Sequence, residues 1–342
     1  MTGAQDVSSL LKSQSTKLSE LTASHQSSEE TSISFSPSTW RERVSLCYTL
    51  PHLAALLSLL TLSIVVVHRL RVEAYRHKEA ALLAERCGFT YLVSVNHTSL
   101  SDLGHSLKSF NSHFVPLPYK ILILHDGLPP VDQGKLQSLS EAPLQFRFLQ
   151  HIVNRTKHNI SLQGPENMIY FWSYLALRQN DYLEDIDFLI RLEPSAVFTR
   201  RIRSDFVLSF VAHGLQYAYP SLHRDCSPNV TQSLKELAVS YVGLNGIQPR
   251  NVPLWNTILT SHAKSCIPYF NNHFEIINLR FFRTHSGIQD WIRAIETHGG
   301  IFHNGWHDGL LRYVTVALYA APSKTAKYGT DRVPISPTRR RK

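Results

Sequence analysis

The chain lacks the short motifs that mark several common classes of cofactor and nucleophile site. Its 342 residues contain no GxGxxG turn, no phosphate-binding P-loop and no serine-centred nucleophile elbow. No internal repeat is visible either. These absences argue against a dinucleotide-binding domain, a P-loop nucleotidase, a serine hydrolase and a repeat protein.

Cysteine is scarce and is not spaced for metal binding. The four cysteines are Cys47, Cys87, Cys226 and Cys266, and none forms a CxxC pair. A zinc site is therefore not expected. One disulfide among the last three is compatible with the sequence, for example Cys226 with Cys266, and the pairing stays open at this stage.

The chain is basic but lacks the surface pattern of a nucleic-acid-binding protein. The formal net charge is +9, and Lys and Arg are scattered except in the tail at residues 339–342. No stripe interleaves aromatic and basic residues, so we expect no nucleic-acid partner. A basic domain suits anionic ligands, including phosphates.

The N-terminal part has few large apolar groups and then one long apolar run. Residues 1–43 are rich in Ser, Thr, Gln and Glu, which predicts a disordered tail. Residues 44–67 contain no Asp, Glu, Lys or Arg and are long enough to cross a bilayer. The alternative is a buried core helix. A cleaved signal peptide fits less well, because the run is long and starts far into the chain.

Four glycosylation sequons give the segment an orientation. They begin at Asn96, Asn154, Asn159 and Asn229, and all follow the apolar run. We therefore expect a cytosolic tail (1–43), a signal-anchor (44–67), a stem (68–88) and a lumenal domain (89–320). The basic segment 321–342 is expected to be unstructured.

After the stem, segments typical of strands alternate with segments typical of helices. This order predicts an α/β domain with a mixed, mostly parallel sheet flanked by helices. The expected strands are residues 90–95, 120–124, 144–149, 188–193, 216–219 and 273–277. The expected helices are residues 101–110, 168–177, 233–242, 287–297 and 310–318.

Several of these segments deliver acidic residues to places where ligands bind. The apolar run 188–192 ends at Glu193, which Pro194 follows, and Asp126 ends an earlier strand. In open α/β sheets, ligands bind at the carboxyl edge. Glu275 lies among amides and aromatics, and Asp308 lies in a Gly- and His-rich loop. The alternative for each carboxylate is a solvated or helix-capping role.

Separated carboxylates of this kind suit sugar transfer from a nucleotide. A divalent ion takes one or two carboxylates together with diphosphate oxygens. Another carboxylate can act at the anomeric carbon, where the transition state is oxocarbenium-like. Trp172 and Trp306 are candidates to stack on a sugar, and the alternative for both is a core position.

The acidic and aromatic segments together resemble a known family over residues 90–319. The matching pieces are Trp172-Ser173-Tyr174, Arg191-Leu192-Glu193-Pro194, Asn272-His273-Phe274-Glu275-Ile276, Leu279-Arg280-Phe281-Phe282, Gly299-Gly300-Ile301-Phe302 and Trp306-His307-Asp308. In this order and spacing, the chain resembles the fungal α-1,2-mannosyltransferases of glycosyltransferase family 15.

The resemblance implies a type II Golgi membrane protein with a GT-A-like α/β fold. It implies GDP-mannose as donor, mannose-terminated glycans as acceptors and Mn²⁺ as cofactor. The metal-binding carboxylate of the family falls on Glu193, and its proposed catalytic carboxylate falls on Glu275. We further expect Arg312, Asp308 and Asp126 at the donor diphosphate.

The chain departs from the family pattern at several positions. Ser195 stands where the family has an aspartate, and Leu175 where it has a proline. The histidine that completes the metal site falls on Arg312, whose guanidinium cannot ligate a metal. A family tyrosine falls near Gly164 or Pro165, and the closing His- and Pro-rich segment has no counterpart in residues 331–342.

Three functions remain open from the sequence. The first is an active Golgi mannosyltransferase, in which Arg312 clamps the diphosphate. The second is a catalytically degraded family member that binds glycans or assembles with other Golgi transferases. The third is an unrelated anchored lumenal protein, which a separation of more than ~15 Å between the carboxyl groups of Glu193 and Glu275 would favour and a shared cleft would exclude.

Overall fold

The computed structural model describes most of the chain after residue 57. The described residues are 58–74, 78, 85–96, 98–114, 119–149, 164–179, 181–202, 205–260, 266–329 and 333–337. The chain divides into two units, residues 1–70 and residues 71–342.

A helix covers residues 58–74, and its side chains are exposed. It includes the last ten residues of the predicted apolar segment 44–67, whose first fourteen residues lie outside the described part. Among the described residues, no helix combines the length and hydrophobicity needed to span a bilayer.

The second unit is built on a seven-stranded sheet in the order β10-β6-β9-β4-β1-β2-β3. Its strands are β1 (Cys87–Val93), β2 (Lys120–His125), β3 (Leu144–Phe148), β4 (Phe188–Leu192), β6 (Tyr217–Tyr219), β9 (Phe274–Asn278) and β10 (Thr325–Lys327). Strands β4, β1, β2 and β3 run parallel, and β9 lies antiparallel between β4 and β6. The predicted mixed, mostly parallel sheet is confirmed.

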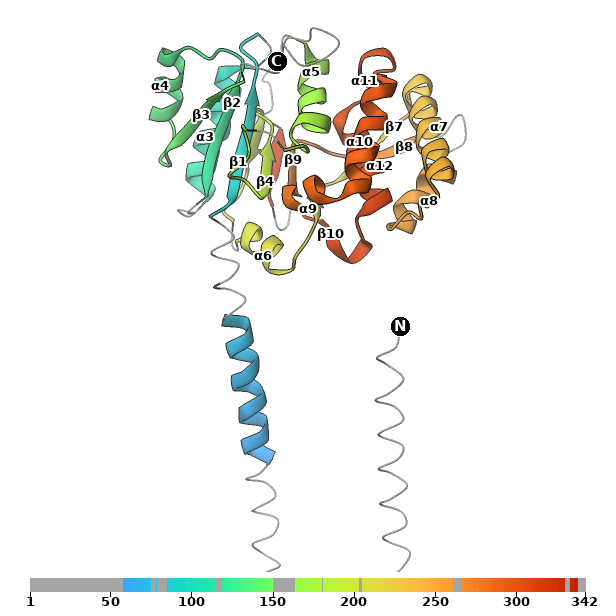
Figure 1. Cartoon of the computed structure of the whole chain (residues 1–342). Coiled ribbons are helices and arrows are strands. Elements are labelled where there is room, and N and C mark those ends of the chain that lie inside the picture. The colour runs from blue at the N-terminus through green and yellow to red at the C-terminus, as the bar shows by residue number, and fades with distance from the viewer. Residues whose placement is uncertain are drawn as a thin grey trace, which may run out of the picture. The chain divides into compact units, whose positions relative to one another are not determined.

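Helices cover the sheet on both faces (Figure 1). They are α3 (Leu100–His113), α4 (Pro130–Ser138), α5 (Pro165–Tyr170), the π-helix η1 (Phe171–Leu175), α6 (Phe206–Ala212), α7 (Pro228–Asn245), α8 (Val252–Thr260), α9 (Leu279–Thr284), α10 (Ser286–His298), α11 (Gly300–His303), α12 (Asp308–Tyr319) and the 3-10 turn η2 (Pro322–Lys324). In Figure 1, α4 and β3 lie at one end of this unit, and α7 and α8 lie at the other.

The strands separate two hydrophobic cores. Leu189 of β4 packs into the core that contains Trp291 of α10 and Val314 of α12. The next residue, Ile190, packs into the core that contains Leu107 of α3 and Phe210 of α6. Successive strand residues point to opposite faces, so an almost unbroken apolar strand such as β4 is what a doubly covered sheet requires.

The C-terminal segment 321–342 is partly packed, which corrects the expectation that it is unstructured. Strand β10 pairs with β6, and β11 (Ile335–Pro337) pairs with β5 (Ala196–Phe198). Tyr328 and Val333 are buried in the core beside α6. These two apolar side chains anchor a segment whose Pro, Lys and Arg content otherwise indicates a tail.

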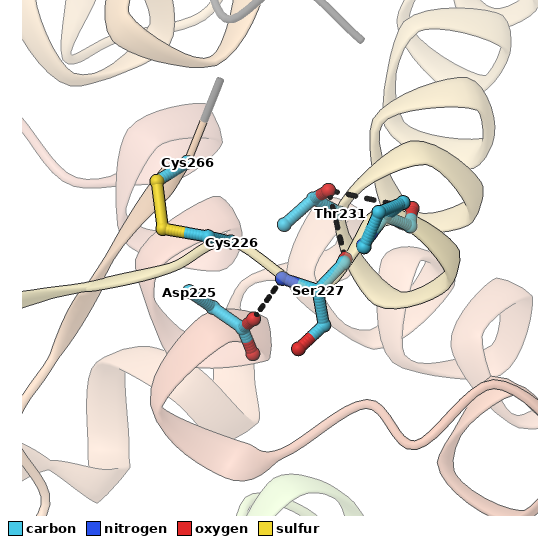
Figure 2. Close-up of a disulfide and its surroundings, with 6 residues drawn as sticks. Asp225, Cys226, Ser227, Thr231 and Cys266 are labelled. Atoms are coloured by element: carbon cyan, nitrogen blue, oxygen red, sulfur yellow. Dashed lines mark hydrogen bonds between the residues drawn. A yellow bond between two sulfur atoms is a disulfide. The ribbon is translucent and has the colours of Figure 1, made fainter. Parts of the chain in front are cut away.

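A disulfide joins Cys226 and Cys266 at the end of a two-stranded ribbon (Figure 2). The ribbon consists of β7 (Leu222–Asp225) and β8 (Ile267–Phe270), in which Asp225 lies opposite Ile267. The pairing named as an example from the sequence is therefore formed. Cys87 is a buried thiol, and burial raises its pKa to about 12.

Candidate functional site

A cleft of about 510 Å³ opens where the parallel strands β1 and β4 end. The residues that line it come from the ends of these strands, from the start of α3, from α5 and η1, from β8 and the segment that follows it, and from the start of α12. They are Leu92, Thr98, Ser99, Asp102, Pro165, Met168, Ile169, Trp172, Arg191, Leu192, Glu193, Pro194, Ser195, Tyr269, Asn272, His307 and Asp308. This is the carboxyl edge of the sheet, where α/β proteins bind ligands.

The antiparallel register of β4 and β9 sets the charges of the cleft wall. Arg191 lies opposite Glu275, and Leu192 lies opposite Phe274. One step further, the backbone N–H of Glu193 donates to the carbonyl of His273 at 3.1 Å. The two strands therefore hold one ion pair inside the sheet and a second pair at its edge.

The second pair, Glu193 and His273, forms the open pair. His273 Nδ1 lies 2.5 Å from Glu193 Oε2, and the side chains are 34% and 29% exposed. Burial raises the pKa of Glu193, but the hydrogen bond from His273 and the charge of Arg191 outweigh it, so that pKa is lowered overall. The same hydrogen bond raises the pKa of His273. Both shifts favour an imidazolium–carboxylate pair facing the cleft.

Four charged residues form the buried ion network: Arg191, Glu275, Asp308 and Arg312. Glu275 Oε1 accepts from Arg191 Nη1 at 3.1 Å, and Glu275 Oε2 accepts from Arg312 Nε at 3.2 Å. Arg191 Nη1 also donates to Asp308 Oδ2. Positive and negative groups therefore alternate along the network, which compensates for removing them from water.

Glu275 lies behind the wall of the cleft. It is 1% exposed, and Tyr217 donates a further hydrogen bond to its Oε2 at 2.9 Å. Neither Glu275 nor Arg312 lines the cleft. Arg312 Nη2 donates to the carbonyl of Trp172 at 3.0 Å. Both oxygens of Glu275 are therefore engaged by protein groups, and Arg312 is directed at Glu275 and the backbone.

Both tryptophans named from the sequence are buried in the core, and they differ in their relation to the cleft. Trp172 lines the cleft, and the guanidinium carbon of Arg191 lies 4.6 Å from its ring centre. Trp306 is fully buried, stacks on His298 at 4.5 Å and donates to Ser233 Oγ at 2.8 Å. Trp306 therefore fixes the segment before α12 and does not line this cleft.

Asp126 lies at the same edge of the sheet but is used by the chain itself. It accepts hydrogen bonds at 2.8 Å from Ser94 Oγ and from the N–H of Val95. These contacts tie the segment after β1 to the end of β2. Asp126 is absent from the cleft lining.

The sequons are divided between described and undescribed residues. Asn96 and Asn229 are exposed. Asn154 and Asn159 lie outside the described residues.

Sequence reasoning did not single out several residues of the cleft. Asn272 donates to Asp308 Oδ1, and Tyr269 and His307 line the wall beside it. His307 also caps α12 by accepting from the N–H of Leu310. Arg191 was quoted only as part of a motif, although a charged residue inside an apolar strand is itself a signal of a buried partner.

The cleft offers a carboxylate to a divalent ion that a ligand also coordinates. Among the described residues, no three His, Cys, Asp or Glu side chains are grouped for metal binding. Both oxygens of Asp308 accept hydrogen bonds. Glu193 Oε1 accepts from no described group, so it fits an ion whose other ligands are diphosphate oxygens and water.

The chain has no counterpart among family models, and no curated protein sequence matches it. Solved structures do match. Core-mannan synthase A (CmsA/Ktr4) from Aspergillus fumigatus, in its Mn/GDP form, superposes with a TM-score of 0.62 at 16% identity, covering 73% of this chain and 74% of that one. The mannosyltransferase Ktr4p from S. cerevisiae superposes with a TM-score of 0.62 at 18% identity, covering 74% and 71%.

The fold is that of these fungal mannosyltransferases. Ktr4p in complex with GDP also matches, with a TM-score of 0.59 at 18% identity, covering 74% of this chain and 72% of that one. The GT-A-like α/β fold implied by the resemblance is thus confirmed.

Proposed function

We propose that the chain is a glycosyltransferase that moves mannose from GDP-mannose to mannose-terminated glycans. The observation that carries this proposal is the cleft at the carboxyl edge, where Glu193, Arg191 and Trp172 lie together. The fold shared with Ktr4p supports it. The resemblance of the motifs supports an α-1,2 linkage.

The chemistry of the cleft wall suits a sugar nucleotide. Arg191 supplies a fixed positive charge for phosphate oxygens, and guanidinium groups bind phosphates through paired N–H donors. Tyr269 is half-buried in the cleft wall and supplies aromatic surface for the apolar face of a ring. The start of α12 adds the positive end of a helix dipole.

The residues of the chain can be assigned parts in the transfer. The bond from the anomeric carbon to the diphosphate breaks, and a bond to an acceptor hydroxyl forms, through an oxocarbenium-like state. Asp308 lines the cleft, and its negative charge stabilises the positive charge that develops on the sugar, while Glu193 is assigned to the divalent ion. Glu275 fixes Arg191 and Arg312 and has no oxygen free for the sugar.

A divalent ion would be held by Glu193 together with the diphosphate. Mn²⁺ in that position would neutralise charge on the leaving group. Because no protein cage is present among the described residues, the ion should bind only with the nucleotide. Electron paramagnetic resonance of Mn²⁺ should therefore report bound metal when GDP is added to the protein and free metal without it. Saturable binding without GDP would contradict this assignment.

We place the protein in the Golgi membrane with its C-terminal domain in the lumen. The uncharged segment 44–67 and the four sequons beyond it support this location. The disulfide between Cys226 and Cys266 is suited to an oxidising compartment. Removal of N-linked glycans from the cellular protein should increase its mobility in a gel, and an unchanged mobility would argue against a lumenal domain.

A transfer assay tests the activity. Full-length protein in detergent, supplied with GDP-mannose, Mn²⁺ and a mannose-terminated acceptor, should release GDP and extend the acceptor. Glu193→Gln should reduce the rate by about 100-fold or more, since removing one preorganised charge-stabilising group costs about that much. Asp132→Asn is the matched control, because Asp132 pairs with exposed Lys135 on α4. No turnover by the wild-type protein would reject the enzyme assignment.

A non-catalytic role in the Golgi is the second candidate. The observation that favours it is the complete engagement of Glu275 by Arg191, Arg312 and Tyr217. Such a protein would bind mannose-terminated glycans or assemble with active transferases. Such a protein would be retained on immobilised mannose-terminated glycan but would release no GDP from GDP-mannose. An active transferase would be retained and would also release GDP.

A further inference from the structure

Arg191 is nearly buried and yet forms part of the cleft wall. Its side chain is 5% exposed, and it is one of the residues that line the cleft. Nη1 donates to both Glu275 and Asp308. Nη2 donates to no group among the described residues. Since a guanidinium carries N–H donors on both terminal nitrogens, the group retains donors for a ligand in the cleft.

The position of Arg191 is fixed on several sides. The ring of Trp172 lies 4.6 Å from the guanidinium carbon. The β4–β9 register sets Arg191 opposite Glu275. A charge held in place before the ligand arrives costs little reorganisation on binding. Arg191 therefore offers a preorganised positive charge, unlike a mobile surface lysine.

Arg312 determines which N–H donors of Arg191 stay available to a ligand. Glu275 divides its two oxygens, because Oε1 accepts from Arg191 and Oε2 accepts from Arg312 and Tyr217. Without Arg312, the charge of Glu275 would fall on Arg191 alone, and a bidentate pair between them would become the best arrangement. By neutralising Glu275 from behind, Arg312 keeps the second terminal nitrogen of Arg191 out of such a pair.

We propose that Arg191 binds the phosphate groups of the nucleotide donor, and that Arg312 is a positioning residue that acts on Arg191 through Glu275. This proposal rests on the proposed function, because it assigns the phosphate-binding group of the same cleft. It gives Arg312 a part that differs from a direct clamp on the diphosphate. It also accounts for a buried arginine where the resemblance places a histidine.

The affinities of the full-length protein for GDP, GMP and guanosine distinguish the loss of a phosphate contact from a distortion of the whole site, because the three ligands differ only in their phosphate groups. Arg191→Lys keeps the charge but loses the forked donors. It should weaken the binding of GDP by about tenfold or more, which is the cost of one charged hydrogen bond. The affinity for guanosine should stay within about twofold of wild type. The loss should decrease in the order GDP, GMP, guanosine.

Arg312→Lys tests the positioning role without touching the ligand. It should weaken the binding of GDP by about threefold to tenfold, while the binding of guanosine is unchanged. Arg147→Lys is the matched control, because Arg147 on β3 also makes a paired contact, with Asp185, but lies outside the cleft. The control should bind GDP within about twofold of wild type. Circular dichroism checks that each variant is folded.

Several outcomes would overturn the proposal. GDP binding by Arg191→Lys within about twofold of wild type would remove the phosphate contact. An equal loss for GDP and guanosine would mean that the substitution only distorts the site. If Arg191→Lys does not fold, unchanged GDP binding by Arg312→Lys decides against the proposal, and selective weakening supports it. A wild-type protein that binds no GDP would instead reject the proposed function.

Discussion

The open pair and the buried ion network lie on the same two strands but differ in their access to the cleft. Glu193 and His273 stand where β4 ends and β9 begins, each about one-third exposed. Glu275 and Arg191 lie within the paired strands, and both are nearly buried. Two carboxylates on neighbouring strands thus have opposite surroundings. The difference indicates which of them can meet a ligand and which of them supports the wall.

Arg312 belongs to the buried ion network, which is why an arginine fits at this position. A histidine is a metal ligand, whereas an arginine has no lone pair to donate. Here Arg312 makes contacts with Glu275 and with the carbonyl of Trp172, both inside the protein. The arginine at the position where the resemblance places a histidine therefore lies in the buried ion network, outside the open pair.

The largest expected difference in stability is that between removing a carboxylate from the buried ion network and removing one from the open pair. Glu275→Gln removes the carboxylate that two buried guanidinium groups share and should lower the free energy of unfolding by about 3–5 kcal/mol. Glu193→Gln breaks a partly exposed pair and should cost about 0–1 kcal/mol. Urea unfolding monitored by circular dichroism measures both.

Asp185→Asn serves as a control for this first comparison. Asp185 pairs with Arg147 and Lys120 and is partly exposed, so its loss should resemble that of Glu193 more than that of Glu275. Equal destabilisation by Glu275→Gln and Glu193→Gln would show that burial does not distinguish the two regions.

A double-mutant cycle should give a smaller but more specific difference. The coupling between Arg312 and Glu275, measured with Arg312→Gln and Glu275→Gln, should be about 1–3 kcal/mol, because the two side chains touch in a buried network. The coupling between His273 and Glu193, measured with His273→Gln and Glu193→Gln, should be below about 1 kcal/mol. A coupling energy between His273 and Glu193 larger than that between Arg312 and Glu275 would contradict the expected difference between the two regions.

Much of the fold followed from the pattern of the sequence. Apolar runs flanked by helical segments predicted β1, β2, β3, β4, β6 and β9, because a doubly covered sheet needs such runs. The short strands β5, β7, β8, β10 and β11 were missed. Their residues pair only after distant segments meet, as Pro337 meets Ala196, and three or four residues carry too weak a pattern.

The site was predictable in its edge residues and less so in its interior. A carboxylate before a proline at the end of an apolar strand predicted a cleft position for Glu193, which lines the cleft. The partner of Glu275 could not be read from spacing, since Arg191 and Arg312 come from a strand and a helix far apart in the chain. The register of β4 against β9 brings Arg191 to Glu275, and α12 brings Arg312 to it.

The smallest expected effect is the pH dependence of the open pair. The pKa of His273 is raised by its hydrogen bond with Glu193, so its contribution to stability is full below the ordinary value of 6.5 and is lost as the pH rises through the raised pKa. The pKa of Glu193 is lowered by His273 and Arg191 despite burial. Its contribution is full above 4.5 and is lost as the pH falls through the lowered pKa.

The open pair should therefore stabilise the protein most between pH 4.5 and pH 6.5. Nuclear magnetic resonance of the His273 ring protons should report a midpoint above the ordinary histidine value, and Glu193→Gln should lower that midpoint. His285 is the control, because burial and the charge of Arg250 lower its pKa and Glu193 takes no part. If Glu193→Gln left the His273 midpoint unchanged, the ion pair would not be the cause, and the contrast with the buried ion network would rest on exposure alone.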